Sequence, residues 1–156
     1  MPDDVAVSVQ PEQGTVLQRE VLAALGEFWG GRDVRHLHHA VWFRQLGAGA
    51  RAARTADGRL VGYLLGTRTD ALAYVHAVAV HPDARGRGVA RDLYGDVLAG
   101  GLPVEAITTP GNAGSLAFHA RLGFTAERVE DWAGPGEPRV LLRRSTSLAD
   151  AGADER

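Results

Sequence analysis

The amino-acid sequence predicts a mixed α/β fold in which helices flank a sheet. Alternating and β-branched apolar runs interchange along the chain with apolar residues spaced three and four apart, the patterns of strands and amphipathic helices. A glycine-rich loop around Gly86 and Gly88 joins one such strand to one such helix. Asp57-Gly58, a typical hairpin turn, separates two further strands. Together these features predict the order β-α-α-β-β-β-α-β-α-β-β.

The first half of the chain supplies four strands and two helices. Valines that alternate with polar or small residues predict the opening strand. Two helices follow it, and Asp33 is placed to cap the second. The hairpin and one further strand come next. The expected ranges are 5–9, 50–54, 60–67 and 72–80 for the strands, and 16–25 and 34–43 for the helices.

The second half begins with a helix that starts near Val89 and carries one apolar stripe as far as Leu98. Gly100-Gly101 ends this helix. Asn112 is placed to cap the next helix, and Gly123 suits the left-handed residue at its end. The expected ranges are 104–108, 124–129 and 140–142 for the strands, and 89–98 and 112–122 for the helices.

Length and composition fit one globular domain. The chain has 156 residues, of which 45% are hydrophobic and 23% charged. We expect residues 1–144 to form this domain and residues 145–156, which have almost nothing to bury, to form a disordered tail. A net charge of −2 argues against nucleic-acid binding. No apolar run reaches the ~18 residues of a membrane span, and the N-terminus is unlike a signal peptide, so we expect a cytoplasmic protein.

A metal site is not expected. The chain has no cysteine, which excludes disulfides and thiolate ligands. His36, His38 and His39 are spaced so that one helix cannot aim all three rings at one ion, and no carboxylate completes the set. We expect these histidines to face solvent or a substrate channel.

The loop before Val89 carries the strongest functional signal in the sequence. A glycine-rich turn between a strand and a helix exposes backbone N–H groups at the positive end of the helix dipole, which favours an anion such as pyrophosphate. Gly86 and Gly88 allow close approach because they carry no Cβ. Arg85, Arg87 and Arg91 add positive charge for phosphate oxygens. The sequence therefore predicts a phosphate-binding loop.

Two familiar phosphate loops do not match this one. A Walker loop requires lysine, which the chain lacks, and a Rossmann fingerprint requires a third glycine. The spacing Arg85-x-x-Gly88-x-Ala90 instead resembles the acetyl-coenzyme A (acetyl-CoA) loop of the GCN5-related N-acetyltransferase (GNAT) family. A second segment, Asn112 to Phe124, ends in Leu-Gly-Phe as a similar helix of that family does. The resemblance covers residues 74–124 and implies a mixed, mostly antiparallel sheet.

The same resemblance implies how acetyl-CoA, as co-substrate, would be held. Backbone groups of Val78 and Val80 would pair with the pantetheine arm, unless these residues serve only as a core strand. Asn112 would lie beside the pantetheine, or act only as a helix cap. The cofactor-binding residues implied are Val78, Ala79, Val80, Arg85, Gly86, Arg87, Gly88, Val89, Ala90, Arg91 and Asn112.

Three side chains are candidate catalytic residues. The string from His76 to His81 is similar to a strand of the arylalkylamine N-acetyltransferases, in which histidines help to remove the amine proton. Tyr74 stands where that subfamily has another histidine and would share a strand face with His76. His119 stands where the family usually has a tyrosine acid, and would protonate the thiolate or merely face the pantetheine. The other reading of His76 is a core histidine bonded to a backbone carbonyl.

The resemblance implies an acetyl-CoA-dependent N-acetyltransferase. The acetyl group would move to a primary amine of a small molecule or peptide by direct attack in a ternary complex. Two alternatives stay open: a catalytically silent acyl-CoA-binding module, and an acyltransferase that uses another acyl-CoA. Strand pairing between C-terminal strands would make a homodimer. An aromatic group in the region that shapes the acceptor pocket of similar enzymes comprises Phe28, Trp29, Trp42 and Phe43.

Overall fold

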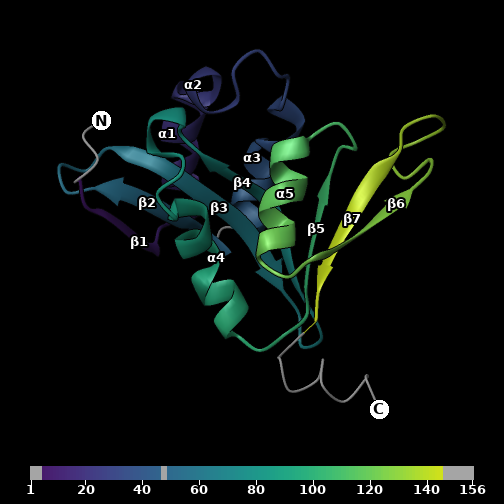
Figure 1. Ribbon diagram of the computed structural model, residues 1–156. Helices are drawn as coiled ribbons and strands as arrows, with labels where there is room; N and C mark the ends of the chain where they lie inside the picture. The colour runs from purple at the N-terminus through teal and green to yellow at the C-terminus, as the bar shows by residue number, and fades with distance from the viewer. Residues whose placement is uncertain (1–4, 47–48, 146–156) are drawn as a thin grey trace. The chain divides into compact units, whose positions relative to one another are not determined.

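Seven strands form one sheet in the computed structural model, which describes residues 5–46 and 49–145 (Figure 1). Their order across the sheet is β1-β2-β3-β4-β5-β7-β6. The strands are β1 Val7–Pro11, β2 Arg51–Thr55, β3 Leu60–Arg68, β4 Ala73–Val80, β5 Val104–Thr108, β6 Thr125–Val129 and β7 Arg139–Arg144. The helices are α1 Gly14–Ala23, α2 Leu25–Trp29, α3 Ala40–Gln45, α4 Val89–Ala99 and α5 Ala113–Arg121, with 3-10 helices η1 Arg35–Leu37 and η3 Pro82–Ala84. The predicted mixed α/β fold is confirmed.

The described residues group into two compact units. Unit 1 contains the described residues up to Thr67 together with His76–Val97, and unit 2 contains Arg68–Val75 and the described residues from Leu98 onwards. Strand β4 contributes its first residues to unit 2 and its last residues to unit 1. One domain over residues 1–144 stays a prediction, and the expected tail lies outside the described residues after residue 145.

Unit 1 is built on the antiparallel strands β1, β2 and β3. β1 pairs with β2 from Val7↔Thr55 to Pro11↔Arg51, and β2 continues antiparallel into β3. Apolar side chains from three helices and the sheet form its core, which is the pattern expected when amphipathic elements bury one face. Its buried members are Leu17, Val21, Phe28, Phe43, Ala50, Ala52, Leu60, Tyr63, Leu65 and Ala79.

The prediction of one helix over residues 34–43 is wrong. The chain forms the single 3-10 turn η1, passes through an extended His39 (φ −62°, ψ 146°), and only then begins α3. Asp33 caps no α-helix; its carboxylate accepts hydrogen bonds from the backbone N and the guanidinium of Arg35. His38 explains the interruption, because its ring bonds the Val34 carbonyl and Tyr63 and so draws the backbone inward.

Smaller differences concern the ends of elements. The predicted helix 16–25 divides at Ala24 into α1 and α2, the opening strand begins at Val7, and β7 is longer than expected. The turn around Asp57-Gly58 is confirmed: Gly58 donates to the Thr55 carbonyl (2.9 Å) and has a left-handed φ of 89°. No described helix is long and apolar enough to cross a membrane.

Unit 2 contains the parallel pairing of β4 with β5 and two antiparallel pairings. Ala73–Val75 aligns with Val104–Ala106, while β7 pairs with both β5 and β6. Asn112 caps α5 as predicted, since its Oδ1 accepts from Ser115 N at 3.2 Å. Gly123 follows α5 with the expected left-handed φ, 89°.

Gly62 is predicted to be required for packing of α4 on β3. A Cβ at this position would lie 3.0 Å from Val89 Cγ1, 3.2 Å from Leu93 Cδ1 and 3.3 Å from Ala53 Cβ. Gly62→Ala should therefore lower the free energy of unfolding by about 1–3 kcal/mol in urea titrations. Gly95→Ala is the matched control: it lies exposed within α4 with open space around it and should stabilise by about 0.5–1 kcal/mol. Equal effects of the two changes would contradict this packing.

Candidate functional site

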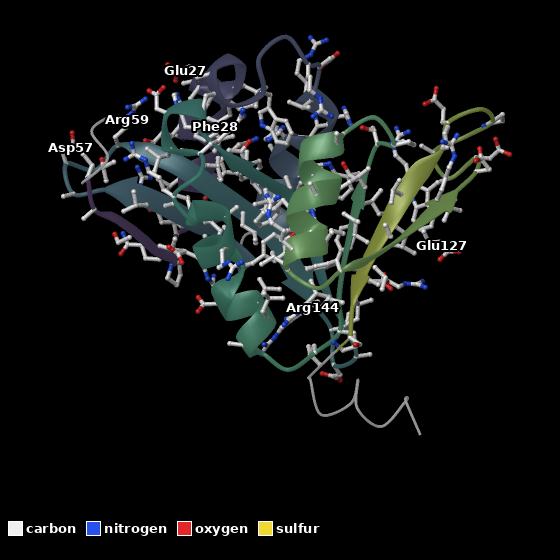
Figure 2. All side chains as sticks on the ribbon, viewed as in Figure 1. Glu27, Phe28, Asp57, Arg59, Glu127 and Arg144 are labelled. Carbon is white, nitrogen blue, oxygen red and sulfur yellow. The ribbon has the colours of Figure 1, made fainter. Side chains whose placement is uncertain are left out.

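The end of β4 is fixed by hydrogen bonds to the neighbouring hairpin. His81 N donates to the Val61 carbonyl (2.8 Å), and His81 Nδ1 accepts from Asp83 N (3.1 Å) at the start of η3. Arg59, beside the turn that contains Asp57 (Figure 2), donates to the Asp83 carboxylate at 3.1 Å. Its guanidinium holds the pKa of Asp83 below the ordinary range. The loop that follows thus starts from a fixed position.

Two left-handed glycines carry the chain from η3 into α4. Gly86 has φ 78° and Gly88 has φ 77°, a region that L-residues rarely adopt. Apart from the two flanking residues, no heavy atom lies within 4 Å of where a Cβ would stand at either glycine. The eleven-residue helix α4 begins directly after Gly88, so its first N–H groups have no intrahelical acceptor. An open backbone surface at a helix N-terminus fits a pyrophosphate.

The three arginines in and after this loop differ in their contacts and exposure. Arg85 donates from Nε to the Val80 carbonyl (3.3 Å) and from Nη2 to the Phe28 carbonyl (3.5 Å), so it ties the end of β4 to α2. Arg87 is half-buried, and Arg91 is exposed on the first turn of α4. Arg91 therefore presents an exposed positive charge on the first turn of α4.

Residues alternate along β4 in the way the sequence predicts. Ala73, Val75, Ala77 and Ala79 are buried, whereas the side chains of the other face are half-buried. That second face carries the predicted site residues Tyr74, His76, Val78 and Val80. One face of the strand is thus buried in the core, and the other carries the candidate catalytic side chains Tyr74 and His76.

His76 donates a hydrogen bond to a backbone carbonyl. Its Nε2 lies 3.0 Å from the Leu37 oxygen, and since that oxygen can only accept, Nε2 carries the hydrogen. In the neutral ring Nδ1 is then the basic nitrogen. Burial lowers the pKa of His76 below 6.5 and favours this neutral form. The hydrogen bond to a backbone carbonyl, which one of the two hypotheses for His76 expected, is present. It is compatible with the second hypothesis, in which His76 is a general base.

Trp42, one of the four aromatic residues expected to shape an acceptor pocket, lies against His76. The two rings have centroids 5.1 Å apart, and Trp42 is 38% exposed. Its Nε1 donates to the His36 carbonyl at 3.1 Å. Phe28, which Figure 2 labels, and Phe43 belong to the core. An apolar, partly open surface therefore adjoins the candidate base.

His38 does not face solvent or a channel, contrary to expectation. Its side chain is 1% exposed; Nδ1 lies 2.7 Å from the Val34 carbonyl and Nε2 lies 2.8 Å from the Tyr63 hydroxyl. Burial lowers the pKa of His38 and raises that of Tyr63. Sequence reasoning missed this pair, although a tyrosine within the apolar strand 60–65 signals a buried hydroxyl that needs a partner. No metal-binding cluster occurs among the described residues.

Three predicted site residues belong to unit 2. Burial and Glu105 raise the pKa of Tyr74, whose register partner is Glu105. Asn112 uses both ends of its amide, because Nδ2 also donates to Thr108 Oγ1 (3.1 Å). His119 is 3% exposed, and its Nδ1 lies 2.8 Å from the Ser115 carbonyl. Burial lowers the pKa of His119.

The fold and the open glycine turn before α4 are accompanied by a match to a known protein family. A sequence model of the Acetyltransferase (GNAT) family matches residues 18–124, so the chain belongs to the GNAT family. No curated protein sequence matches significantly.

Solved structures show the same fold. A GNAT-family protein from Desulfovibrio desulfuricans is 22% identical, with a TM-score of 0.66 over 91% of this chain and 100% of that one. The ribosomal-protein-S18-alanine N-acetyltransferase of Escherichia coli is 13% identical (TM-score 0.68, covering 92% and 96%). An acetyltransferase-type protein of Salmonella typhimurium, solved with its cofactor acetyl-CoA, is 17% identical (0.63, 91% and 95%).

Three buried or half-buried histidines are predicted to make stability fall below neutral pH. His38, His76 and His119 all have a pKa below 6.5 in the folded protein, so the unfolded chain binds more protons as the pH falls through that value. The free energy of unfolding should therefore be lower at about pH 5.5 than at about pH 7.5 in urea titrations.

His38→Gln should reduce this difference between the two pH values, because it removes one of the titrating groups. His39→Gln changes an exposed neighbour and is the matched control. An unfolding free energy that does not change with pH in the native protein would show that these rings are not held neutral.

Proposed function

We propose that the protein is an acetyl-CoA-dependent N-acetyltransferase that acts on a primary amine. The observation that carries this proposal is the open, left-handed glycine turn at the N-terminus of α4 in a chain of the GNAT family. Backbone amides from Gly86 to Arg91 would hold the pyrophosphate, with added charge from Arg91. Backbone groups of Val78 and Val80 would pair with the pantetheine, beyond the Ala73–Val75 segment that pairs with β5.

His76 is the proposed general base. Acetyl-CoA supplies an activated thioester: the amine nitrogen forms a bond to the acetyl carbon, and the carbon–sulfur bond breaks. His76 Nδ1 would accept the proton that the amine loses, while Nε2–H stays on the Leu37 carbonyl. Trp42 would offer its ring surface to the acceptor beside this base. Holding both partners in place contributes more than the proton transfer, up to roughly 7–11 kcal/mol.

A hydroxyl group is a better proton donor to the leaving thiolate than His119 is. The Ser115 carbonyl can only accept, so Nδ1 of His119 carries the hydrogen and Nε2 donates only in the protonated ring. Burial disfavours that protonated ring. Tyr74 has a raised pKa and keeps its hydroxyl proton at neutral pH. We retain Tyr74 and His119 as proposed site residues, with Tyr74 as the better donor.

Release of free coenzyme A thiol tests the proposed function. The protein with acetyl-CoA is assayed against small aliphatic and aromatic amines, amino acids and short peptides with a free N-terminus. Amine-dependent thiol release, with the acetylated amine found by mass spectrometry, supports the proposal. Turnover only with propionyl- or succinyl-CoA would make it another acyltransferase, and binding without any turnover would make it an acyl-CoA-binding module.

His76→Gln is predicted to lower kcat by about 10²–10⁴-fold, the usual contribution of a general base. The Michaelis constant for acetyl-CoA should stay unchanged, because the phosphate-binding turn is untouched. The acid limb of the native pH–rate profile should lie below pH 6.5, since burial lowers the pKa of this base. His39→Gln is the control. A His76→Gln variant with native kcat and the native acid limb would exclude His76 as the base.

A further inference from the structure

The Leu37 carbonyl that holds His76 lies in a segment with little regular structure. Leu37 is the last residue of the single turn η1. Within this turn Leu37 N donates to the Val34 carbonyl and His38 N donates to the Arg35 carbonyl, both at 3.0 Å. A turn this short has no ladder of hydrogen bonds to keep its carbonyls in place. The direction of the Leu37 carbonyl must therefore depend on side-chain contacts.

His38, the next residue, makes those contacts. Its ring binds Val34 O on one side and the Tyr63 hydroxyl on the other, and its own carbonyl accepts from Gln18 Nε2 at 3.2 Å. The Tyr63 hydroxyl also accepts from Trp29 Nε1 at 2.7 Å. Backbone on both sides of Leu37 is thereby attached to the buried β3 strand and to α1.

The direction of each hydrogen bond follows from the donors and acceptors present. Val34 O can only accept, so His38 carries its hydrogen on Nδ1, and Nε2 accepts from the Tyr63 hydroxyl. Trp29 Nε1 can only donate, so the Tyr63 oxygen accepts from it. The hydrogen bonds therefore run from Trp29 through Tyr63 and His38 to Val34. His38 is an Nδ1–H tautomer, the opposite of His76.

We propose that His38 and Tyr63 are positioning residues for His76, acting through the Leu37 carbonyl. This inference rests on the proposed function, in which His76 Nδ1 accepts the amine proton. Without the Tyr63 hydroxyl, His38 Nε2 has no donor at this position, and the buried ring gains by rotating or changing tautomer. The Leu37 carbonyl then loses its fixed direction. Part of the His76 population becomes Nδ1–H, a form that cannot accept a proton at Nδ1.

The imidazole nitrogen resonances of the full-length, ¹⁵N-labelled protein test this positioning without any substrate. In the native protein His38 should give the Nδ1–H pattern and His76 the Nε2–H pattern. Tyr63→Phe, which keeps the ring volume, should convert His76 to a mixture of tautomers. Tyr94→Phe deletes another buried tyrosine hydroxyl of unit 1 and should leave His76 as in the native protein. An unchanged Nε2–H pattern of His76 in Tyr63→Phe would overturn the proposal.

Kinetics separate this proposal from the proposed function. Tyr63→Phe should lower kcat about tenfold, less than loss of the base itself, with the Michaelis constant for acetyl-CoA unchanged. A shifted tautomer with native kcat would leave the positioning supported and exclude His76 as the base. Should Tyr63→Phe not fold, His38→Gln removes the ring that links the Tyr63 hydroxyl to the Val34 carbonyl and should shift the His76 tautomer in the same direction. A native His76 pattern in that variant would overturn the positioning.

Discussion

The passage from β4 into α4 is the constraint on which the proposed chemistry depends. Strand β4 carries His76 in its middle, and its end is held by the bond from His81 N to the Val61 carbonyl. Only glycine adopts the left-handed conformations at residues 86 and 88 without strain. These turns bring the N-terminus of α4 next to the strand end. One continuous segment of chain therefore supplies both the proposed phosphate contacts and the proposed base.

A second constraint acts on the base from the opposite side. His76 is held by the carbonyl of Leu37, in a segment that regular helix does not stabilise. The buried pair of His38 and Tyr63 supplies the missing rigidity, and every fully buried side-chain nitrogen or oxygen in the described part of the chain has a partner. Such satisfied polar groups can specify one arrangement of a core, because an unpaired buried group is costly. A single tautomer of His76 is the chemical consequence.

Much of this arrangement could be predicted from local sequence. Some features can be predicted from residues only a few positions apart, and the structure has them as expected. They are the left-handed glycines at positions 58 and 123, the Asn112 cap and the strand 104–108. The prediction of a helix directly after Asp33 was wrong because the His38 ring forms a hydrogen bond with Tyr63, 25 residues away. The Leu37 contact of His76 spans 39 residues, so spacing along the chain could not reveal it. Long-range polar contacts thus determined the break in the helix and the orientation of His76, which the local sequence pattern could not predict.

Isothermal titration with acetyl-CoA tests the central claim, the phosphate-binding turn, most directly. The native protein should bind with saturable heat. Gly88→Ala places a Cβ in the open turn at a left-handed φ and should abolish or strongly weaken binding. Gly58→Ala imposes the same kind of backbone strain in the β2–β3 hairpin and should bind as the native protein does. No binding by the native protein, or equal binding by all three, would contradict the account.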